Sequence, residues 1–228
     1  MDTSSPVATV AIIEGDILKA EYSINHQLTH SEKLMPMIND IMSVLKLNPT
    51  DLDLIAVSKG PGSFTGIRIG VATANTMAQA LNIPVVGVDA IEAMAYGLFG
   101  YEGVIMPIMD AQRKRVYTGI YKFKNGKFET LKDVEVMGIE DFIELTEQYE
   151  KVALVGDGVE VFEEILKGKS HIEIPPGSVR LARASNVGFL AKSLYSGSSE
   201  DKIVRPMYLR KSQAEIQFEE REKANGGK

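Results

Sequence analysis

A glycine-rich stretch over residues 58–70 has the residue types and spacing best suited to binding chemistry. Glycine lets a backbone turn tightly, and a turn leading from a strand into a helix exposes N–H groups that can hold an anion. Gly60, Gly62, Ser63 and Thr65 are therefore candidate contacts to an anion or a nucleotide. The stretch lacks the Gly-Lys-Ser/Thr of a Walker A loop and the spacing of a Rossmann fingerprint. A tight turn with Ser63 or Thr65 capping the helix explains it equally well.

Two histidines, His26 and His30, stand four residues apart, a spacing that on a helix would place both rings on one face, as in some metal sites. However, Thr29 and Glu32 form a capping-box pattern, which predicts that a helix begins at Thr29. His26 then falls in the preceding loop, and no third ligand stands at a recognisable spacing. We expect a solvent-exposed pair and no metal.

Two short motifs have a plain structural explanation beside a functional one. Arg113, Lys114 and Arg115 form a basic cluster next to an expected hairpin. A solvated turn is the favoured explanation, and contacts to RNA phosphates or to an acidic partner are the alternative. Residues 156–158, Gly-Asp-Gly, follow an expected strand at a place where a nucleotide could bind. A β-to-α turn explains them equally well, and without a matching acid–glycine motif elsewhere we assign no nucleotide site to this chain.

The elements that must position these residues occur as a repeated unit. In the first half we expect strands at 7–13, 17–24, 53–58 and 84–88, and helices at 29–46, 65–81 and 90–99. In the second half we expect strands at 104–110, 116–123, 129–136 and 152–155, and helices at 139–149, 159–166 and 185–195. Hairpins give antiparallel pairs and crossovers give parallel ones, so each sheet should be mixed. Two copies of a βββαβα unit indicate a duplicated α/β fold, in which the first copy lacks its first strand.

The composition is that of a globular protein with an acidic balance. The 228 residues include 44% hydrophobic and 25% charged residues, carry a net charge of -6 and contain no cysteine. The acidic balance argues against a general nucleic-acid binder, although a local basic patch would be compatible with it. No apolar run approaches the roughly 20 residues that span a bilayer. We expect a cytoplasmic protein without disulfides and without a membrane partner.

The expected helix over residues 29–46 carries more apolar residues than one core-facing stripe needs. Leu34, Ile38, Ile41 and Leu45 form such a stripe at helical spacing. The other apolar residues suggest a partner surface, because methionine is common at adaptable interfaces; they are Met35, Met37, Met42 and Val44. The next helix offers small residues that allow close helix approach, among them Ala72, Thr73, Thr76 and Ala80. One broad face buried within the monomer is the alternative.

The sequence of residues 60–70, Gly-Pro-Gly-Ser-Phe-Thr-Gly-Ile-Arg-Ile-Gly, resembles the signature of the TsaB (YeaZ) family. Further family-like pieces follow in the expected order along almost the whole chain: Asp2-Thr3-Ser4, His30-Ser31-Glu32, Asp110-Ala111-Gln112-Arg113 with Val116-Tyr117, Val155-Gly156-Asp157-Gly158 and Pro206-Met207-Tyr208-Leu209-Arg210. The resemblance implies a duplicated actin-like (ASKHA, ribonuclease H-like) fold with mixed sheets.

The lobes of such a fold would span residues 1–102 and 103–215, with a helix over residues 182–195 packing back toward the first lobe. Residues 216–228 have little to bury and are expected to form a frayed tail. Members of the family usually have a short apolar strand before Asp-Thr-Ser, whereas Met1 directly precedes Asp2 here. We therefore expect the first strand of the first lobe to be missing, at a considerable loss of stability.

The resemblance also implies that the chain is not an enzyme. The family is similar to its catalytic paralogue TsaD, which carries a metal on two histidines four residues apart. Ala90 and Met94 stand at the corresponding positions. Alanine offers no lone pair and a single thioether is a weak ligand for such an ion, so we expect no metal site and no transfer chemistry.

The function implied by the resemblance is that of a scaffold or activator. Such a subunit would dimerise with TsaD and, with the ATPase TsaE, support transfer of threonylcarbamoyl to a tRNA adenosine. ATP or ADP would bind only in the assembled complex, tRNA would be contacted indirectly, and the chain alone would form a homodimer. The family pairs through the two helices described above, which points to these interface residues: Met35, Ile38, Met42, Arg68, Ala72, Thr73 and Thr76.

Two other functions remain as alternatives. An independent actin-fold kinase or metallopeptidase-like enzyme would need phosphate loops or a metal site, and neither is recognisable in the sequence. A direct tRNA-binding module would need a basic surface, which the net charge of -6 disfavours.

Overall fold

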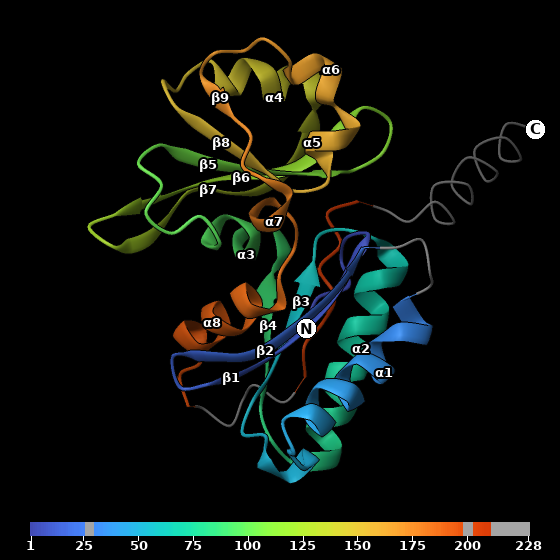
Figure 1. The fold of residues 1–228 in the computed structure, drawn as a ribbon. Coiled ribbons are helices and arrows are strands. Elements are labelled where there is room, and N and C mark those ends of the chain that lie inside the picture. Colours follow the sequence, from blue (N-terminus) through green and yellow to red (C-terminus); the bar gives the residue numbers. More distant parts are fainter. Residues whose placement is uncertain (26–29, 198–202, 211–228) are drawn as a thin grey trace, which may run out of the picture.

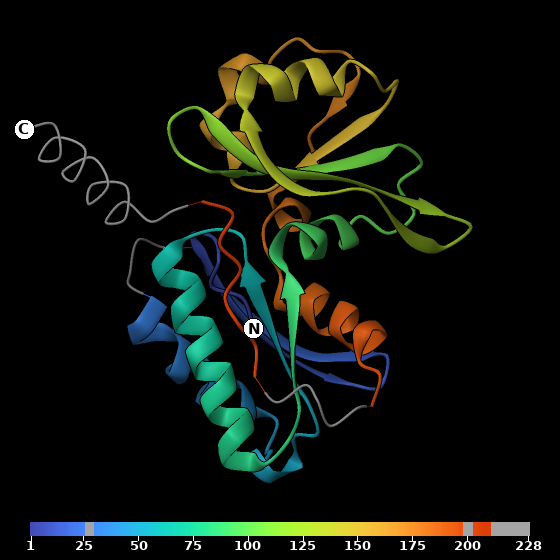
Figure 2. The ribbon, with the colours of Figure 1, turned by 180° about the vertical axis from the view of Figure 1, so that it is seen from behind.

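The computed structural model describes residues 1–25, 30–197 and 203–210, which form two lobes (Figures 1 and 2). The elements of the first lobe are β1 (Val7–Glu14), β2 (Ile17–Asn25), α1 (His30–Val44), the short 3-10 helix η1 (Pro49–Asp51), β3 (Ile55–Gly60), α2 (Phe64–Leu81) and β4 (Val85–Asp89). Those that build the second lobe are β5 (Val104–Asp110), β6 (Arg115–Lys124), β7 (Lys127–Gly138), α4 (Ile139–Thr146), β8 (Val152–Val155), α5 (Gly158–Val161), α6 (Glu163–Leu166) and β9 (Ile172–Glu173). The remaining helices are α3 (Ala90–Tyr96), α7 (Gly177–Arg180) and α8 (Ala184–Leu194).

The sheet of the second lobe is mixed, as expected. Its strands are ordered β7-β6-β5-β8-β9, with β5 at the centre. β5 pairs antiparallel with β6 on one side and parallel with β8 on the other. Every residue of β5 except Asp110 is buried, because helices or loops cover both faces of the sheet.

The strands of the first lobe form two separate ladders, β1-β2 and β3-β4. Backbone hydrogen bonds of Met1 and Asp2 link the two ladders. The Met1 ammonium donates to the carbonyl of Ala56 at 2.8 Å, and Ser58 N–H donates to the carbonyl of Met1 at 3.0 Å. Asp2 exchanges two hydrogen bonds with Thr9 of β1, each 2.9 Å long.

The strands of the two lobes follow the same order. If Met1 and Asp2 are counted as a strand, the first lobe has the order β2-β1-(1–2)-β3-β4, which matches β7-β6-β5-β8-β9. Residues 1 and 2 thus occupy the place that β5 fills along its whole length in the second lobe. The prediction of a duplicated mixed α/β fold is confirmed.

Helices cover the strands of the first lobe from two sides (Figure 1). α1 packs on β1 and β2, and α2 packs on β3. α8 packs on β1, β3 and β4, and α3 contacts both α8 and the strands of the second lobe. The segment 203–210 then crosses the first lobe beside α2 (Figure 2). The last residues of the described chain therefore return to the space between the lobes.

Several helix bounds differ from those predicted. The helix expected over residues 90–99 ends at Tyr96, one residue before Gly97, and the one expected over 139–149 ends at Thr146. The helix expected over 159–166 is divided into α5 and α6, because Phe162 leaves the helical region with φ -113° and buries its ring in the second-lobe core. The predicted cap Thr29 and the expected tail at 216–228 lie outside the described residues.

Candidate functional site

The glycine-rich loop joins β3 to α2 and packs against the N-terminal segment. A Cβ atom on Gly62 would clash with the carbonyl oxygen of Ser4, and one on Gly66 would clash with that of Thr3. The close approach of two backbones is therefore what requires glycine here. Ser63 N–H holds the same contact by donating to the carbonyl of Ser4 at 2.7 Å.

The loop's own hydrogen bonds favour the tight-turn interpretation. Ser63 Oγ accepts from Gly66 N–H at 3.2 Å and so caps α2. The amides of Ser63 and Gly66 are thus already bonded within the chain. Two of the four residues predicted to contact an anion, Gly62 and Ser63, line a pocket. The other two do not line it: Thr65 is exposed to solvent, and Gly60 lies against the carbonyl of Met207.

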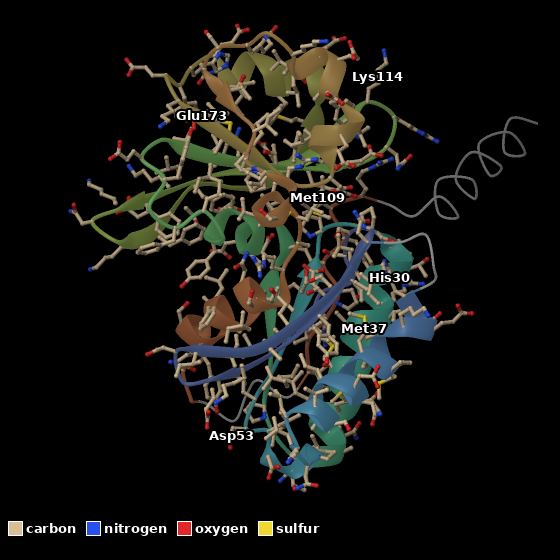
Figure 3. The ribbon with its side chains drawn as sticks, in the orientation of Figure 1. His30, Met37, Asp53, Met109, Lys114 and Glu173 are labelled. Atoms are coloured by element: carbon tan, nitrogen blue, oxygen red, sulfur yellow. The ribbon has the colours of Figure 1, made fainter. Side chains whose placement is uncertain are left out.

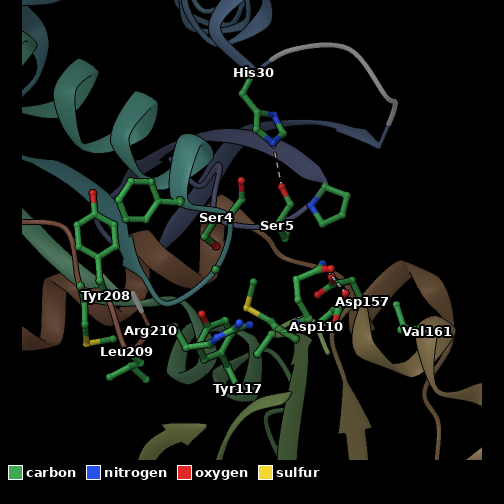
Figure 4. Close-up of a pocket in the computed structure, with 18 residues that line it drawn as sticks. Ser4, Ser5, His30, Asp110, Tyr117, Asp157, Val161, Tyr208, Leu209 and Arg210 are labelled. Atoms are coloured by element: carbon green, nitrogen blue, oxygen red, sulfur yellow. Dashed lines mark hydrogen bonds between the residues drawn. The ribbon is translucent and has the colours of Figure 1, made fainter. Parts of the chain in front are cut away.

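That pocket lies between the lobes and has a volume of about 480 Å³ (Figure 4). Residues 4–6 and 62–64 line it from the first lobe, residues 109–112 from the second lobe, and residues 207–210 from the C-terminal segment. His30 also lines it and bonds through Nε2 to the carbonyl of Ser5 at 3.0 Å. His30 is partly buried, so the prediction of an exposed side chain is wrong for it, while His26 lies outside the described residues.

Two carboxylates stand on the second-lobe side of the pocket. Asp110 is satisfied by Gln112, whose backbone N–H and side-chain amide each donate to it at 2.8 Å. Asp157 Oδ1 is buried without a hydrogen-bond partner among the described residues. Burial, with a smaller contribution from the charge of Asp110, raises the pKa of Asp157 to about 6. A carboxylate that is costly to bury and faces a pocket is typical of a functional site.

Replacing this carboxylate should make the protein more stable at neutral pH. Because the pKa of Asp157 is about 6 in the folded chain and ordinarily 3.8 for an aspartate, its contribution to stability is present below pH 3.8 and lost as the pH rises through 6. We expect Asp157→Asn to gain about 2 kcal/mol of unfolding free energy, relative to the parent, between pH 4 and pH 8. Urea unfolding at both pH values measures this difference. Asp40→Asn, at an exposed position on α1, controls for the loss of one charge, and a gain that did not change with pH would contradict the prediction.

The C-terminal segment is fixed to the first lobe at several points. Asn75 exchanges two hydrogen bonds of 2.9 Å with the backbone of Val204, and Met207 N–H donates to the carbonyl of Lys59 at 2.7 Å. Farther along, the ring of Tyr208 stacks on Phe64 with centroids 4.3 Å apart.

Arg68 completes this stack at the edge of the pocket. Its guanidinium lies 4.0 Å above the Phe64 ring, and its Nε donates to Tyr208 Oη at 2.9 Å. The guanidinium is thereby held in one orientation on an exposed surface, a type of group that is enriched at protein interfaces. The sequence signals for this contact were the two family-like stretches at residues 60–70 and 206–210.

The predicted interface residues divide into exposed and buried groups. Met35, whose exposed fraction is 50%, lies on the surface with Arg68, Ala72 and Thr76, and Thr73 is partly buried. Ile38 and Met42 are only 7% and 6% exposed and belong to the first-lobe core. The core-facing position predicted for Ile38 is confirmed, and the prediction that Met42 lies off the core-facing stripe is wrong.

The physical reason lies in the width of the buried stripe of α1. Its buried residues follow the spacing i, i+3, i+4, i+7, i+8, which is a broad core-facing stripe rather than a narrow one; they are Leu34, Met37, Ile38, Ile41 and Met42. Figure 3 shows Met37 directed from α1 toward the strands. Met35 and Val44 are the exposed large apolar residues of α1, and helical spacing places them on opposite flanks of the buried stripe. We call Met35, Arg68, Ala72, Thr73 and Thr76 together the α1–α2 surface.

The two positions at which the family resemblance implies that metal-binding histidines are replaced, Ala90 and Met94, lie in α3. Ala90 and Met94 are 0% and 3% exposed and pack in an apolar cluster with Ile105 and Tyr121. Within residues 1–25, 30–197 and 203–210, no three His, Cys, Asp or Glu side chains come together as metal ligands would. Over the same residues, no helix combines the length and the apolar character needed to cross a bilayer.

Two lobes with matching mixed sheets and a pocket between them define an actin-like (ASKHA) protein. Residues 24–218 match the family model described as "TsaD: tRNA N6-adenosine threonylcarbamoyltransferase". A Bacillus subtilis (strain 168) protein named "tRNA threonylcarbamoyladenosine biosynthesis protein TsaB" is 32% identical, over 98% of this chain and 98% of its own. The chain therefore belongs to the TsaB (YeaZ) family.

Other relatives agree with this assignment. The protein of the same name from Escherichia coli (strain K12) is 26% identical over 94% of each chain. Among solved structures, "YeaZ from Pseudomonas aeruginosa" superposes with a TM-score of 0.72 at 20% identity, covering 91% of this chain and 97% of that one. At that identity the superposition supports the fold and nothing further.

Proposed function

We propose that this chain is a non-catalytic scaffold or activator subunit in tRNA threonylcarbamoyladenosine biosynthesis. It pairs with the catalytic paralogue TsaD and, with the ATPase TsaE, supports transfer of threonylcarbamoyl to a tRNA adenosine. The observation that carries this proposal is the 32% identity, over 98% of both chains, to a protein named for that pathway. ATP or ADP binds in the assembled complex, and the chain has no metal or nucleotide cofactor of its own.

The chemistry of the chain supports an accessory role. Alanine and methionine at positions 90 and 94 are buried in an apolar cluster, where a divalent ion would have neither charge nor suitable ligands. In the glycine-rich loop, the amides of Ser63 and Gly66 are already bonded within the chain and are therefore not free to bind nucleotide phosphates. Both features disfavour the alternative of an independent kinase or metallopeptidase-like enzyme.

The α1–α2 surface is the proposed contact with TsaD. Small side chains at Ala72, Thr73 and Thr76 let a helix of the partner approach closely, and the exposed Met35 offers an adaptable apolar contact. Arg68, fixed by Phe64 and Tyr208, adds a preorganised charge at one end of the same helix. A paralogue with the same fold can present a similar helix pair, so a homodimer and the complex with TsaD compete for this surface.

Capture of the cognate TsaD on immobilised chain tests the proposal. We expect Ala72→Glu to weaken capture by at least about 30-fold, since an unpaired charge buried in an interface costs about 2 kcal/mol or more. Thr130→Glu, an exposed position on β7 in the other lobe, is the matched control and should leave capture unchanged.

Assays of activity separate the scaffold from an enzyme. The chain alone should neither hydrolyse ATP nor modify tRNA, and its addition to TsaD and TsaE should raise the rate of tRNA modification. Modification by the chain alone, or full activity of TsaD without it, would rule out the proposed role.

A further inference from the structure

The basic turn between β5 and β6 has an unusual backbone. Gln112, Arg113 and Lys114 have φ values of 62°, 57° and 58°, so three consecutive residues with side chains adopt the left-handed conformation. Each such residue costs about 1–2 kcal/mol relative to an ordinary conformation. A hairpin turn could be built from glycine and asparagine without this strain.

Several hydrogen bonds hold the turn in this conformation. The carboxylate of Asp110 accepts two bonds of 2.8 Å from Gln112. Ala111 N–H donates to the carbonyl of Arg115 at 2.9 Å, and Ile139 N–H, at the start of α4, donates to the carbonyl of Lys114 at 2.9 Å. The turn is therefore a defined structure, and it presents its side chains from a fixed backbone.

The side chains that this turn presents are basic and exposed. Arg113, Lys114 and Arg115 are all exposed, and none of them takes part in an ion pair within the described residues. The side chain of Lys114 projects outward from the edge of the second lobe (Figure 3). In a chain with a net charge of -6, three adjacent cations without acidic partners form a distinct positive patch.

This positive patch continues into the pocket. Arg115 and Tyr117 are two residues apart on β6 and therefore point to the same face of the strand. Tyr117 and Arg210 line the pocket together, and Arg210 likewise has no ion-pair partner among the residues that the structure describes. Burial raises the pKa of Tyr117, and the nearby positive charges of Arg210 and Arg115 oppose that shift. Arg210 thus shares the pocket with Tyr117, and Arg115 stands two residues before Tyr117 on the same face of β6.

We propose that Arg113, Lys114, Arg115 and Arg210 form a contact site for the phosphodiester backbone of RNA. Guanidinium groups bind phosphate oxygens with paired hydrogen bonds, and the phenol of Tyr117 adds a neutral donor. A single phosphate group would need only Arg115 and Arg210, the two arginines whose charges act on Tyr117. The extension of the patch over Arg113 and Lys114, out of the pocket and onto the surface, instead suits a chain of several phosphates.

This inference rests on the proposed function, because a subunit of a tRNA-modifying complex is the setting in which it would meet RNA. It revises the expectation of an indirect contact only locally, since the patch is too small to make the chain a general nucleic-acid binder. Its contribution to the complex would be to orient a tRNA that is bound mainly elsewhere.

Binding of an unmodified tRNA transcript to the full chain tests the inference directly. The variant carries Arg113→Gln, Lys114→Gln and Arg115→Gln. Its matched control carries Lys122→Gln, Lys124→Gln and Lys127→Gln, at the other end of β6 and the start of β7. At low salt we expect the first variant to bind about tenfold more weakly than the control, and its plot of log K against log salt to be shallower by about 2. Circular dichroism checks that both variants are folded.

The inference would be overturned by no binding of the transcript by the parent chain, by equal losses in the two variants, or by binding of ADP in place of RNA. TsaD capture is measured on the same proteins. If the first variant loses TsaD instead of RNA, the turn contacts an acidic protein surface and the inference fails. Capture by the parent chain tests the proposed function separately, because a chain that captures TsaD and binds no RNA loses only this inference.

Discussion

A chain extended before Met1 by five apolar residues should unfold roughly 5–10 °C above the chain described here, because the added strand would complete the first-lobe sheet. Met1 and Asp2 already make the hydrogen bonds of such a strand, parallel to β3 and antiparallel to β1. Residues added before them would continue between the two ladders in the same register. Thermal unfolding followed by circular dichroism measures the effect.

The expected gain in stability can be estimated from the burial of β5 in the second lobe. There β5 fills the equivalent place, and all of its residues except Asp110 are buried. Each fully buried apolar side chain contributes about 1.5–3 kcal/mol, and ordering each residue of the strand costs about 1–2 kcal/mol. A net gain of a few kcal/mol is a large fraction of the stability of an ordinary domain.

The control is an extension of the same length made of glycine and serine. Either extension converts the Met1 ammonium to an amide, and this conversion has its own effect. Burial lowers the pKa of the Met1 amine to about 6 from 8.0, so its contribution to stability is present above pH 8.0 and lost as the pH falls through 6. Both extensions should remove this pH dependence, and only the apolar one should raise the melting temperature further. Equal melting of the two extended chains would show that no strand inserts.

The fold could be predicted from the sequence to the extent that it depends on local patterns. The alternation of β-branched runs with turns placed the strands, and the repeat of these elements indicated the duplication and the missing strand. The bounds at Tyr96 and Phe162 were missed because they depend on the packing of the following residues against the second lobe. The left-handed turn at residues 112–114 was missed because neither glycine nor asparagine marks it; the carboxylate of Asp110 and the start of α4 hold it instead.

The candidate site was less predictable, because it is assembled from distant parts of the chain. The stack of Phe64, Arg68 and Tyr208 joins residues 140 positions apart, and the pocket draws on both lobes and the C-terminal segment. The residues of α1 show a second limit. Periodicity indicated an apolar helix but not how much of its circumference α2 and β1 cover, and so Met42 was assigned to the wrong face.

Met42→Glu and Met35→Glu, on the same helix, should have opposite consequences. Met42 is 6% exposed in a core cluster with Leu34, Ile38 and Ile41, so a carboxylate there should destabilise the fold by about 4 kcal/mol or more. Met35 is 50% exposed, so the same change should alter the free energy of unfolding by no more than about 0.5 kcal/mol. Urea unfolding measures both values.

Association with a partner should be weakened by Met35→Glu rather than by Met42→Glu, because Met35 lies on the proposed α1–α2 surface and Met42 does not. We expect the parent chain to be a homodimer, and Met35→Glu to remain folded while shifting to a monomer and weakening TsaD capture. Sizing by light scattering and circular dichroism on the same samples separates loss of association from loss of fold. If Met42→Glu folds with native stability, the core does not close over that side chain. If Met35→Glu stays dimeric and captures TsaD as the parent does, the partner surface lies elsewhere, since an unpaired charge cannot be buried in a contact without a measurable loss of affinity.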